Sequence, residues 1–223
     1  MDLLDTFWNW PVLREALPLL LQGLGVTVSL GAASIALGFA GGLALCLMRL
    51  YAPVPLRAAA RLYTDVLRSI PILVLLVLIY YALPFVGVRL SSFAAATTAL
   101  SMVSSAYTAE ILRAGIEAIP RGQSEAAAAL GLGFVDTLRD VILPQALRIV
   151  VPPLTSNGIN VLKDTALASV VAMPELLKQA TQAQALSANP TPLIGAALLY
   201  LALLLPLVRL VGRFEARHRM VTR

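Results

Sequence analysis

Residues 16–48 read ALPLLLQGLGVTVSLGAASIALGFAGGLALCLM, and none of these 33 residues is charged. A membrane-spanning α-helix needs about 20 predominantly apolar residues to cross the hydrocarbon core of a bilayer. A stretch this long is expected to tilt in the membrane or to protrude from it. It therefore predicts a helical membrane protein.

The composition of the whole chain supports the same class. Of its 223 residues, 59% are hydrophobic and 13% are charged, and the mean hydropathy is +0.83. Soluble domains average about 45–50% apolar and 25% charged residues. These values exclude a disordered chain, a coiled coil and an ordinary soluble enzyme, and the single cysteine, Cys46, excludes an intrachain disulfide scaffold. Without an internal repeat or a low-complexity linker, residues 1–223 are expected to form a single domain.

The uncharged stretches predict an all-α membrane protein with five transmembrane helices. We expect these helices over about residues 18–47, 70–88, 92–112, 148–172 and 191–210. The linkers 49–68 and 113–148 hold four arginines each, and the tail after residue 208 holds five. Basic loops stay in the cytoplasm, which places the N-terminus outside and the C-terminus inside. That orientation requires an odd number of crossings, in agreement with five helices.

Two stripes of small side chains predict close helix packing. In the first predicted helix, small residues recur at every fourth position, at Ser34, Gly38, Gly42 and Cys46. Hydroxyl-bearing residues follow one side of the third predicted helix, at Thr97, Ser101, Ser104, Ser105 and Thr108. Small residues at such spacing allow the backbone of another helix to approach closely.

The linker 113–148, RAGIEAIPRGQSEAAAALGLGFVDTLRDVILPQALR, is too polar to cross the membrane. We expect Ser124 to cap a helix that begins near Glu125 and continues through four alanines, which favour helix formation. Gly131 permits a sharp turn, and a second helix then leads toward Pro144, which is expected to end or bend it. Residues 114–147 are thus predicted to form a helix-turn-helix with a smooth alanine face.

This loop is a candidate surface for docking another protein. The alternative is an amphipathic helix that lies on lipid, which would favour an excess of Lys and Arg on its polar face. Here four arginines are balanced by Glu117, Glu125, Asp136 and Asp140. The balanced charge favours a protein partner over the lipid surface.

Ionisable residues inside a membrane helix are costly, and they indicate function by default. In the fourth predicted helix, Asn157, Asn160 and Asp164 share a face, whereas Lys163 points roughly 100° away. These residues line a translocation path or gate, or they form an interhelical hydrogen-bond cluster from which Lys163 snorkels outward. Both interpretations stay open at this point.

Glu110 is a further candidate for the path or gate, near the cytoplasmic end of the third helix. Its spacing predicts an i,i+3 pair with Arg113, and Asp65 has the same spacing to Arg68. No catalytic residue or metal ligand set is predicted, because Cys46 lies in an apolar helix and the only histidine, His218, lies in the basic tail.

Several segments resemble the permeases of bacterial ABC importers. Glu125-Ala126-Ala127, Gly131 and Val141-Ile142-Leu143-Pro144 resemble the EAA motif of that family in type and spacing, with Val141 in place of the usual isoleucine. Four further segments are similar to permeases for polar amino acids: DVLRSIP at 65–71, AYTAEILRAGI at 106–116, RGQ at 121–123 and KDTALAS at 163–169. The similar segments are spread over roughly residues 20–180.

The resemblance implies the type I ABC importer permease fold, in the bacterial inner membrane. It implies a subunit that imports a polar amino acid by alternating access, together with a second permease subunit, two ATP-binding subunits and an amino-acid-binding protein in the periplasm or outside the cell. ATP and Mg would be bound by the partner ATPase, since this chain holds no phosphate-binding loop of the G-x-x-x-x-G-K-[ST] type and no cofactor of its own is expected. The expected contacts with the ATPase are Arg121, Gly122, Glu125, Ala126, Ala127 and Gly131.

Two other functions remain as alternatives. An ATP-independent secondary transporter or channel is less favoured, because the chain has no inverted repeat. An intramembrane enzyme ranks last, because no nucleophile–base pair is evident. A role in nucleic-acid binding is not expected, because the excess of arginine is explained by cytoplasmic loop charge.

Overall fold

The computed structural model of this chain describes residues 7–219, with side chains as far as residue 212, and the described residues form helices without any strand. The helical segments in chain order are α2 (Trp10–Tyr51), α3 (Val54–Ser69), α4 (Ile72–Val77), η1 (Leu78–Ala82), η2 (Leu83–Val86), α5 (Ser92–Glu117), α6 (Arg121–Ala129), α7 (Phe134–Asp136), η3 (Thr137–Ile142), α8 (Leu143–Asp164), η4 (Thr165–Val171), α9 (Leu176–Ser187) and α10 (Thr191–Arg219). Of these, η1 and η3 are π-helical, and η2 and η4 are 3₁₀-helical.

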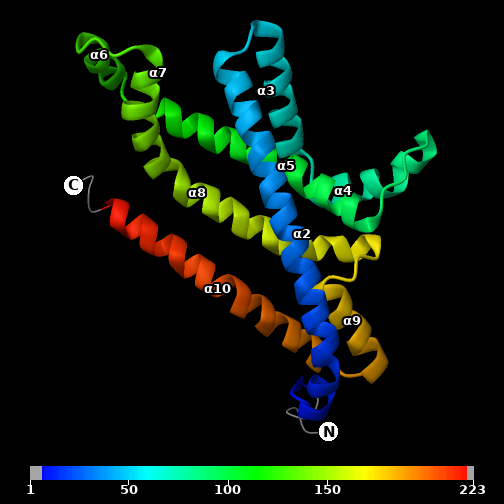
Figure 1. The fold of residues 1–223 in the computed structure, drawn as a ribbon. Coiled ribbons are helices and arrows are strands. Elements are labelled where there is room, and N and C mark those ends of the chain that lie inside the picture. Colours follow the sequence, from blue (N-terminus) through cyan, green and yellow to red (C-terminus); the bar gives the residue numbers. More distant parts are fainter. Residues whose placement is uncertain (1–6, 220–223) are drawn as a thin grey trace.

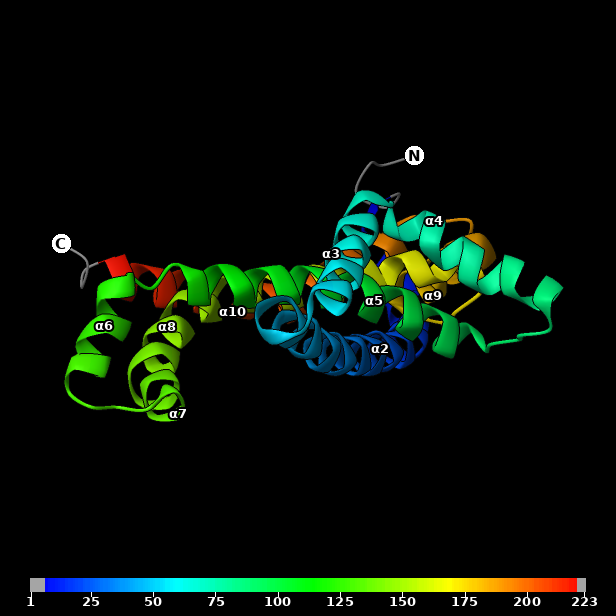
Figure 2. The ribbon, with the colours of Figure 1, turned by 90° about the horizontal axis from the view of Figure 1, so that it is seen from above.

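The helix α5 lies at the centre of the molecule. It packs against α2, α3 and α8, while α10 covers α8 and the N-terminal half of α2 contacts α9 (Figure 1). The α2–α3 connection, α6 and the end of α10 lie toward one end of the molecule, and α9 lies toward the other. Viewed from above, the molecule is elongated, with α6 and α7 at one extremity and the arm formed by α4, η1 and η2 at the other (Figure 2).

Small residues bring α2 and α5 together. A Cβ atom added at Gly38 would lie 2.6 Å from the Cβ of Ser104, and one added at Gly42 would lie 2.5 Å from the Cβ of Thr108. Both distances are far below van der Waals contact, so these positions accept only glycine at this helix separation. The prediction that both small-residue stripes serve helix packing is confirmed.

Three of the predicted spans lie inside continuous helices. Residues 18–47 lie in α2, 92–112 in α5 and 191–210 in α10. The span 148–172 begins earlier, at Leu143, and changes to a 3₁₀-helix at Thr165. Pro144 does not end the helix, because it directly follows the π-helical turn of η3, which accommodates the missing proline N–H within the continuous helix.

The predicted span 70–88 corresponds to α4, η1 and η2, a helical stretch that runs from Ile72 to Val86. The chain bends by 103° between α3 and α4 and then continues through the π and 3₁₀ segments of the arm. Ile70 is extended, with φ −89° and ψ 130°, as the residue before a proline generally is. Two further helices, α3 and α9, were not predicted, because their polar sequences read as linkers.

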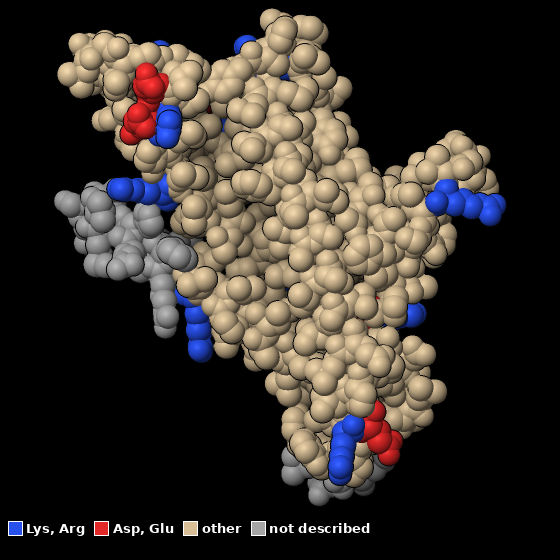
Figure 3. Space-filling view, in the orientation of Figure 1, with Lys and Arg blue, Asp and Glu red and all other residues tan. Residues whose placement is uncertain are grey.

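Length and hydropathy do not confirm five spans among the described residues. Two helices are long and apolar enough to cross a membrane, Trp10–Tyr51 and Thr191–Gly212, and the bent pair Val54–Ser69 with Ile72–Val86 makes up to three. The helix α5 is long enough but not apolar enough to be one of these helices, because its buried face carries serine and threonine in place of large apolar residues. On the face that Figure 3 shows, charged side chains lie mostly near the extremities, with a broad uncharged surface between them.

Candidate functional site

The predicted docking loop folds as α6, a turn and the continuous helix of α7, η3 and α8. The helix α6 begins at Arg121, four residues before the predicted start, and Ser124 lies inside it without capping it. Pro120 precedes the helix, and its carbonyl accepts a hydrogen bond from the Gln123 N–H at 2.9 Å. The expected cap at Ser124 is therefore wrong, because the proline ends the preceding segment and sets the start of the helix.

The turn after α6 depends on Gly131. Its φ of +81° lies in the left-handed region, which glycine adopts without steric cost. The Leu132 N–H donates to the Ala127 carbonyl at 3.1 Å, and the Gly131 N–H donates to the Ala128 carbonyl at 2.9 Å. This hydrogen-bond pattern is a Schellman C-cap, and it confirms the predicted sharp turn.

Five of the six predicted ATPase-contacting residues are exposed on this loop: Arg121, Gly122, Glu125, Ala126 and Gly131. The sixth, Ala127, is buried at 3% exposure, so its side chain faces the interior of the subunit. Behind α6 is a cavity of about 430 Å³, whose lining includes Tyr51, Ser124 and Phe134. Gln145 on α8 donates to the Gln123 side-chain oxygen at 3.2 Å, which ties α6 to the helix that carries the membrane polar residues.

The polar residues of α8 meet at one cavity of about 230 Å³. Four of the five predicted path residues line it, namely Asn157, Asn160, Lys163 and Asp164. Asn160 and Lys163 are exposed and Asp164 is half-buried. Although Lys163 points away from the other three on an ideal helix, its side chain reaches the same cavity. Residues of α4 and α5 complete the lining, including Ile72, Ser104 and Tyr107.

Asn157 also takes part in interhelical hydrogen bonds. Its side-chain nitrogen donates to the Ser104 hydroxyl at 3.2 Å and to the Thr108 hydroxyl at 3.3 Å. These bonds join α8 to α5 beside the cavity. The α8 polar residues thus combine a structural contact at Asn157 with exposed polar groups at Asn160 and Lys163.

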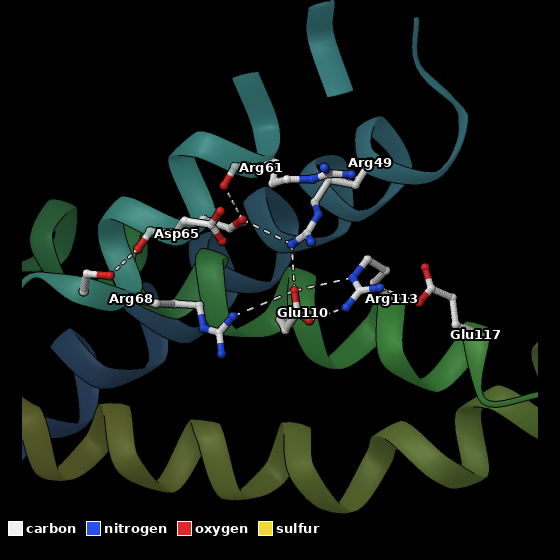
Figure 4. Close-up of polar contacts among 9 residues, drawn as sticks. Arg49, Arg61, Asp65, Arg68, Glu110, Arg113 and Glu117 are labelled. Carbon is white, nitrogen blue, oxygen red and sulfur yellow. Dashed lines mark hydrogen bonds and ion pairs between the residues drawn. The ribbon is translucent and has the colours of Figure 1, made fainter. Parts of the chain in front are cut away.

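Glu110 lies in an ionic cluster that joins α2, α3 and α5 (Figure 4). Its carboxylate accepts a 2.7 Å hydrogen bond from Arg49 and pairs with Arg113, which also pairs with Glu117. Arg49 is only 10% exposed and donates to the Thr64 hydroxyl at 3.1 Å. The predicted pair of Glu110 and Arg113 is confirmed, but Glu110 itself does not line the cavity.

The predicted pair of Asp65 and Arg68 does not form. Arg68 lies instead 3.9 Å from the Glu110 carboxylate, and its guanidinium carbon stands 5.5 Å from the centroid of the Tyr107 ring. The backbone carbonyl of Asp65 accepts the Ser69 hydroxyl. The sequence contained the i,i+3 spacing but no signal for the competing partners on α5.

Within the described part of the chain, no group of three or more His, Cys, Asp or Glu side chains could hold a metal ion. The predicted basic tail is only partly visible. The side chains of Arg213, Arg217, His218 and Arg219 and the whole of Arg223 lie outside the described residues. The structure does not test the role of that tail.

Comparisons with known proteins are consistent with this geometry. Residues 35–220 match the family described as binding-protein-dependent transport system inner membrane component. The chain is 40% identical over 210 residues to the probable glutamine ABC transporter permease protein GlnP of Bacillus subtilis, covering 92% of this chain and 96% of GlnP. It is 37% identical over 203 residues to the arginine transport system permease protein ArtQ of the same organism, covering 90% and 92% of the two chains.

Solved structures share the fold. A chain in the crystal structure of an amino acid ABC transporter with histidines has a TM-score of 0.88 and 36% identity, covering 94% of this chain and 98% of that one. A chain of the MetNI methionine ABC transporter in an inward-facing conformation has a TM-score of 0.72 and 25% identity, covering 89% and 95%.

Proposed function

This chain belongs to the family of binding-protein-dependent transport system inner membrane components and is a polar amino acid ABC importer permease, and from that premise we propose how it works. It moves a polar amino acid across the bacterial inner membrane by alternating access, driven by ATP hydrolysis in a partner subunit. The observation that carries this proposal is the exposed helix α6, held at one end of the molecule by the left-handed turn at Gly131.

The helix α6 is the proposed coupling element. Arg121, Gly122, Glu125 and Ala126 face outward and contact the ATPase, while Ala127 packs beneath the helix. The alanine-rich surface lets α6 enter a groove without large side-chain rearrangement. Movement of α6 then reaches α8 through η3 and through the hydrogen bond between Gln123 and Gln145.

The cavity on α8 is the proposed translocation path. An amino acid carries an ammonium and a carboxylate, and the cavity presents Asp164 and Lys163 as groups of opposite charge. Asn157 and Asn160 add hydrogen-bonding capacity in the same cavity. Glu110 acts at the edge of the path, where it holds α2, α3 and α5 together and so stabilises one state of the gate.

The complete importer contains further subunits. Two ATP-binding subunits bind ATP and Mg, a second permease subunit, identical or related, completes the path, and a periplasmic or extracellular binding protein delivers the amino acid. The end of the molecule with α6 and the α2–α3 connection faces the cytoplasm. The arginines of residues 49–68 and 113–148 support this orientation.

Two glycine substitutions test the coupling role. Gly131 and Gly87 have φ of +81° and +85°, and a Cβ added at either meets no atom within 4 Å. Leucine at either position therefore carries the same left-handed strain, about 1–2 kcal/mol, without a clash at its Cβ atom. We expect Gly131→Leu to abolish ATPase docking or uptake in proteoliposomes that contain the ATPase and the binding protein.

Gly87→Leu is the matched control, because Gly87 lies in the arm, away from α6. It is expected to retain ATPase docking and most uptake at a similar loss of stability. Equal transport by the two variants would overturn the coupling role of α6. Uptake that continues when ATP is withheld would instead favour an ATP-independent transporter.

A further inference from the structure

Arg68 is the arginine of the ionic cluster whose charge is not neutralised. Glu110 is engaged by Arg49 and by Arg113, and Arg113 also takes Glu117. The five side chains comprise three guanidiniums and two carboxylates, so one positive charge is left over. Since Arg49 and Arg113 are in direct contact with carboxylates, the unmatched charge falls on Arg68.

The donors of Arg68 are also unused. A guanidinium has five N–H donors, and Arg68 donates none of them in a hydrogen bond to the described part of the chain. Its nearest carboxylate oxygen, on Glu110, is 3.9 Å away, and its side chain is 39% exposed. In Figure 4 one guanidinium nitrogen faces Glu110 while another points away from it.

The guanidinium of Arg68 lies next to the translocation cavity. It stands 5.5 Å from the centroid of the Tyr107 ring, and Tyr107 lines the cavity together with Lys163. Arg68 is also the penultimate residue of α3, directly before the bend that leads into α4. It therefore lies at the edge of the ionic cluster that is next to the cavity, on the side that we assign to the cytoplasm.

We propose that Arg68 is a second binding station for the α-carboxylate of the transported amino acid, on the cytoplasmic side of the cavity. The planar guanidinium matches a carboxylate in a two-point hydrogen bond, which a lysine cannot form. The amino acid leaves Lys163, is held by Arg68 beside Tyr107, and is then released to the cytoplasm. This inference rests on the proposed transport function.

The weak contacts of Arg68 suit such a transient role. A cation–π contact at an exposed site contributes only about 0.5–1 kcal/mol, and a pair at 3.9 Å lacks a hydrogen bond. A substrate carboxylate can therefore displace Arg68 from Glu110 without breaking the bonds of Arg49 and Arg113. The rest of the cluster then holds the helices in place while Arg68 moves.

Chemical modification tests the site directly. The permease with its ATPase is reconstituted in phosphatidylcholine nanodiscs and treated with the arginine reagent phenylglyoxal, and the labelling rate of each arginine is read by mass spectrometry. An equimolar mixture of the proteinogenic L-amino acids other than aspartate and glutamate is the probe. When the mixture is supplied at a few times its dissociation constant, mass action predicts that Arg68 is labelled about fivefold more slowly than without the mixture. Arg61, exposed on the same helix, is the internal control and is expected to label at an unchanged rate.

Two further labelling experiments identify the group that Arg68 binds. The corresponding mixture of L-amino-acid amides lacks the α-carboxylate and is expected to give no protection. Nanodiscs that contain phosphatidylglycerol supply an anionic lipid headgroup and are also expected to give none. Equal protection by the amides, protection by phosphatidylglycerol, or no protection by the amino acids would each overturn the assignment.

A substitution separates this inference from the proposed function. Uptake by proteoliposomes with the wild-type permease first identifies the amino acid that is taken up fastest. If no amino acid is taken up, the transport function itself is refuted. For that amino acid, Arg68→Gln is expected to lower uptake about tenfold through loss of a charge-assisted hydrogen bond, with Arg68→Lys recovering only part. Arg61→Gln is the matched variant and is expected to keep wild-type uptake. Wild-type uptake by Arg68→Gln would refute the site while leaving the transport function standing.

Discussion

Replacing Gly42 with alanine is expected to destabilise the packing of α2 on α5. The added Cβ would lie 2.5 Å from the Thr108 Cβ and 2.9 Å from the Ser105 carbonyl oxygen, and the latter belongs to the backbone and cannot rotate away. Overpacking of this kind costs about 1–3 kcal/mol, whereas alanine in place of glycine within a helix contributes about 1 kcal/mol in favour. The net loss is therefore about 1 kcal/mol.

Gly25→Ala on the same helix is the matched control. Gly25 is exposed, and its added Cβ meets no atom within 4 Å, so only the helix-propensity gain of about 0.5–1 kcal/mol remains. The two variants should thus shift the melting temperature in opposite directions, each by roughly 2–4 °C per kcal/mol for a chain of this length. The assay is thermal unfolding of the detergent-purified permease followed by fluorescence. Equal or greater stability of Gly42→Ala would refute the close α2–α5 contact.

Three further substitutions probe the buried polar contacts. Glu110→Gln is expected to cost roughly 2 kcal/mol of stability by removing the charged partner of Arg49, and a thermal scan of the double variant Arg49→Gln/Glu110→Gln should show the two losses to be non-additive. Tyr200→Phe removes a 3.1 Å hydrogen bond to the fully buried Glu175, with an expected loss of about 1.5–3 kcal/mol in the same scan. Asn157→Leu is expected to leave the permease folded and membrane-inserted but to lower uptake about tenfold or more. The substitution removes the hydrogen bonds of Asn157 to α5 and one polar group of the cavity. Unchanged uptake would place Asn157 outside the path.

The sequence predicted the membrane class, the loop and its turn because those features depend on consecutive residues. The apolar run 16–48 belongs to α2, and Gly131 takes the left-handed turn that its place after four alanines suggested. Hydrophobicity and backbone preference act within a few residues, so they can be read along the chain. The bend before Pro71 also has a local cause, because a residue that precedes a proline favours an extended backbone.

Only the tertiary structure decided which polar groups meet. Arg49 is 61 residues from Glu110 in the chain, yet its guanidinium donates a 2.7 Å hydrogen bond to the Glu110 carboxylate. The sequence paired Arg68 with Asp65, whereas the helix arrangement places Arg68 beside Tyr107 and Glu110. Such partners depend on how helices from distant parts of the chain cross one another, and no local spacing encodes that crossing. The sequence by itself therefore determined what kind of protein this is, and the packing of α2, α3, α5 and α8 determined where its charges act.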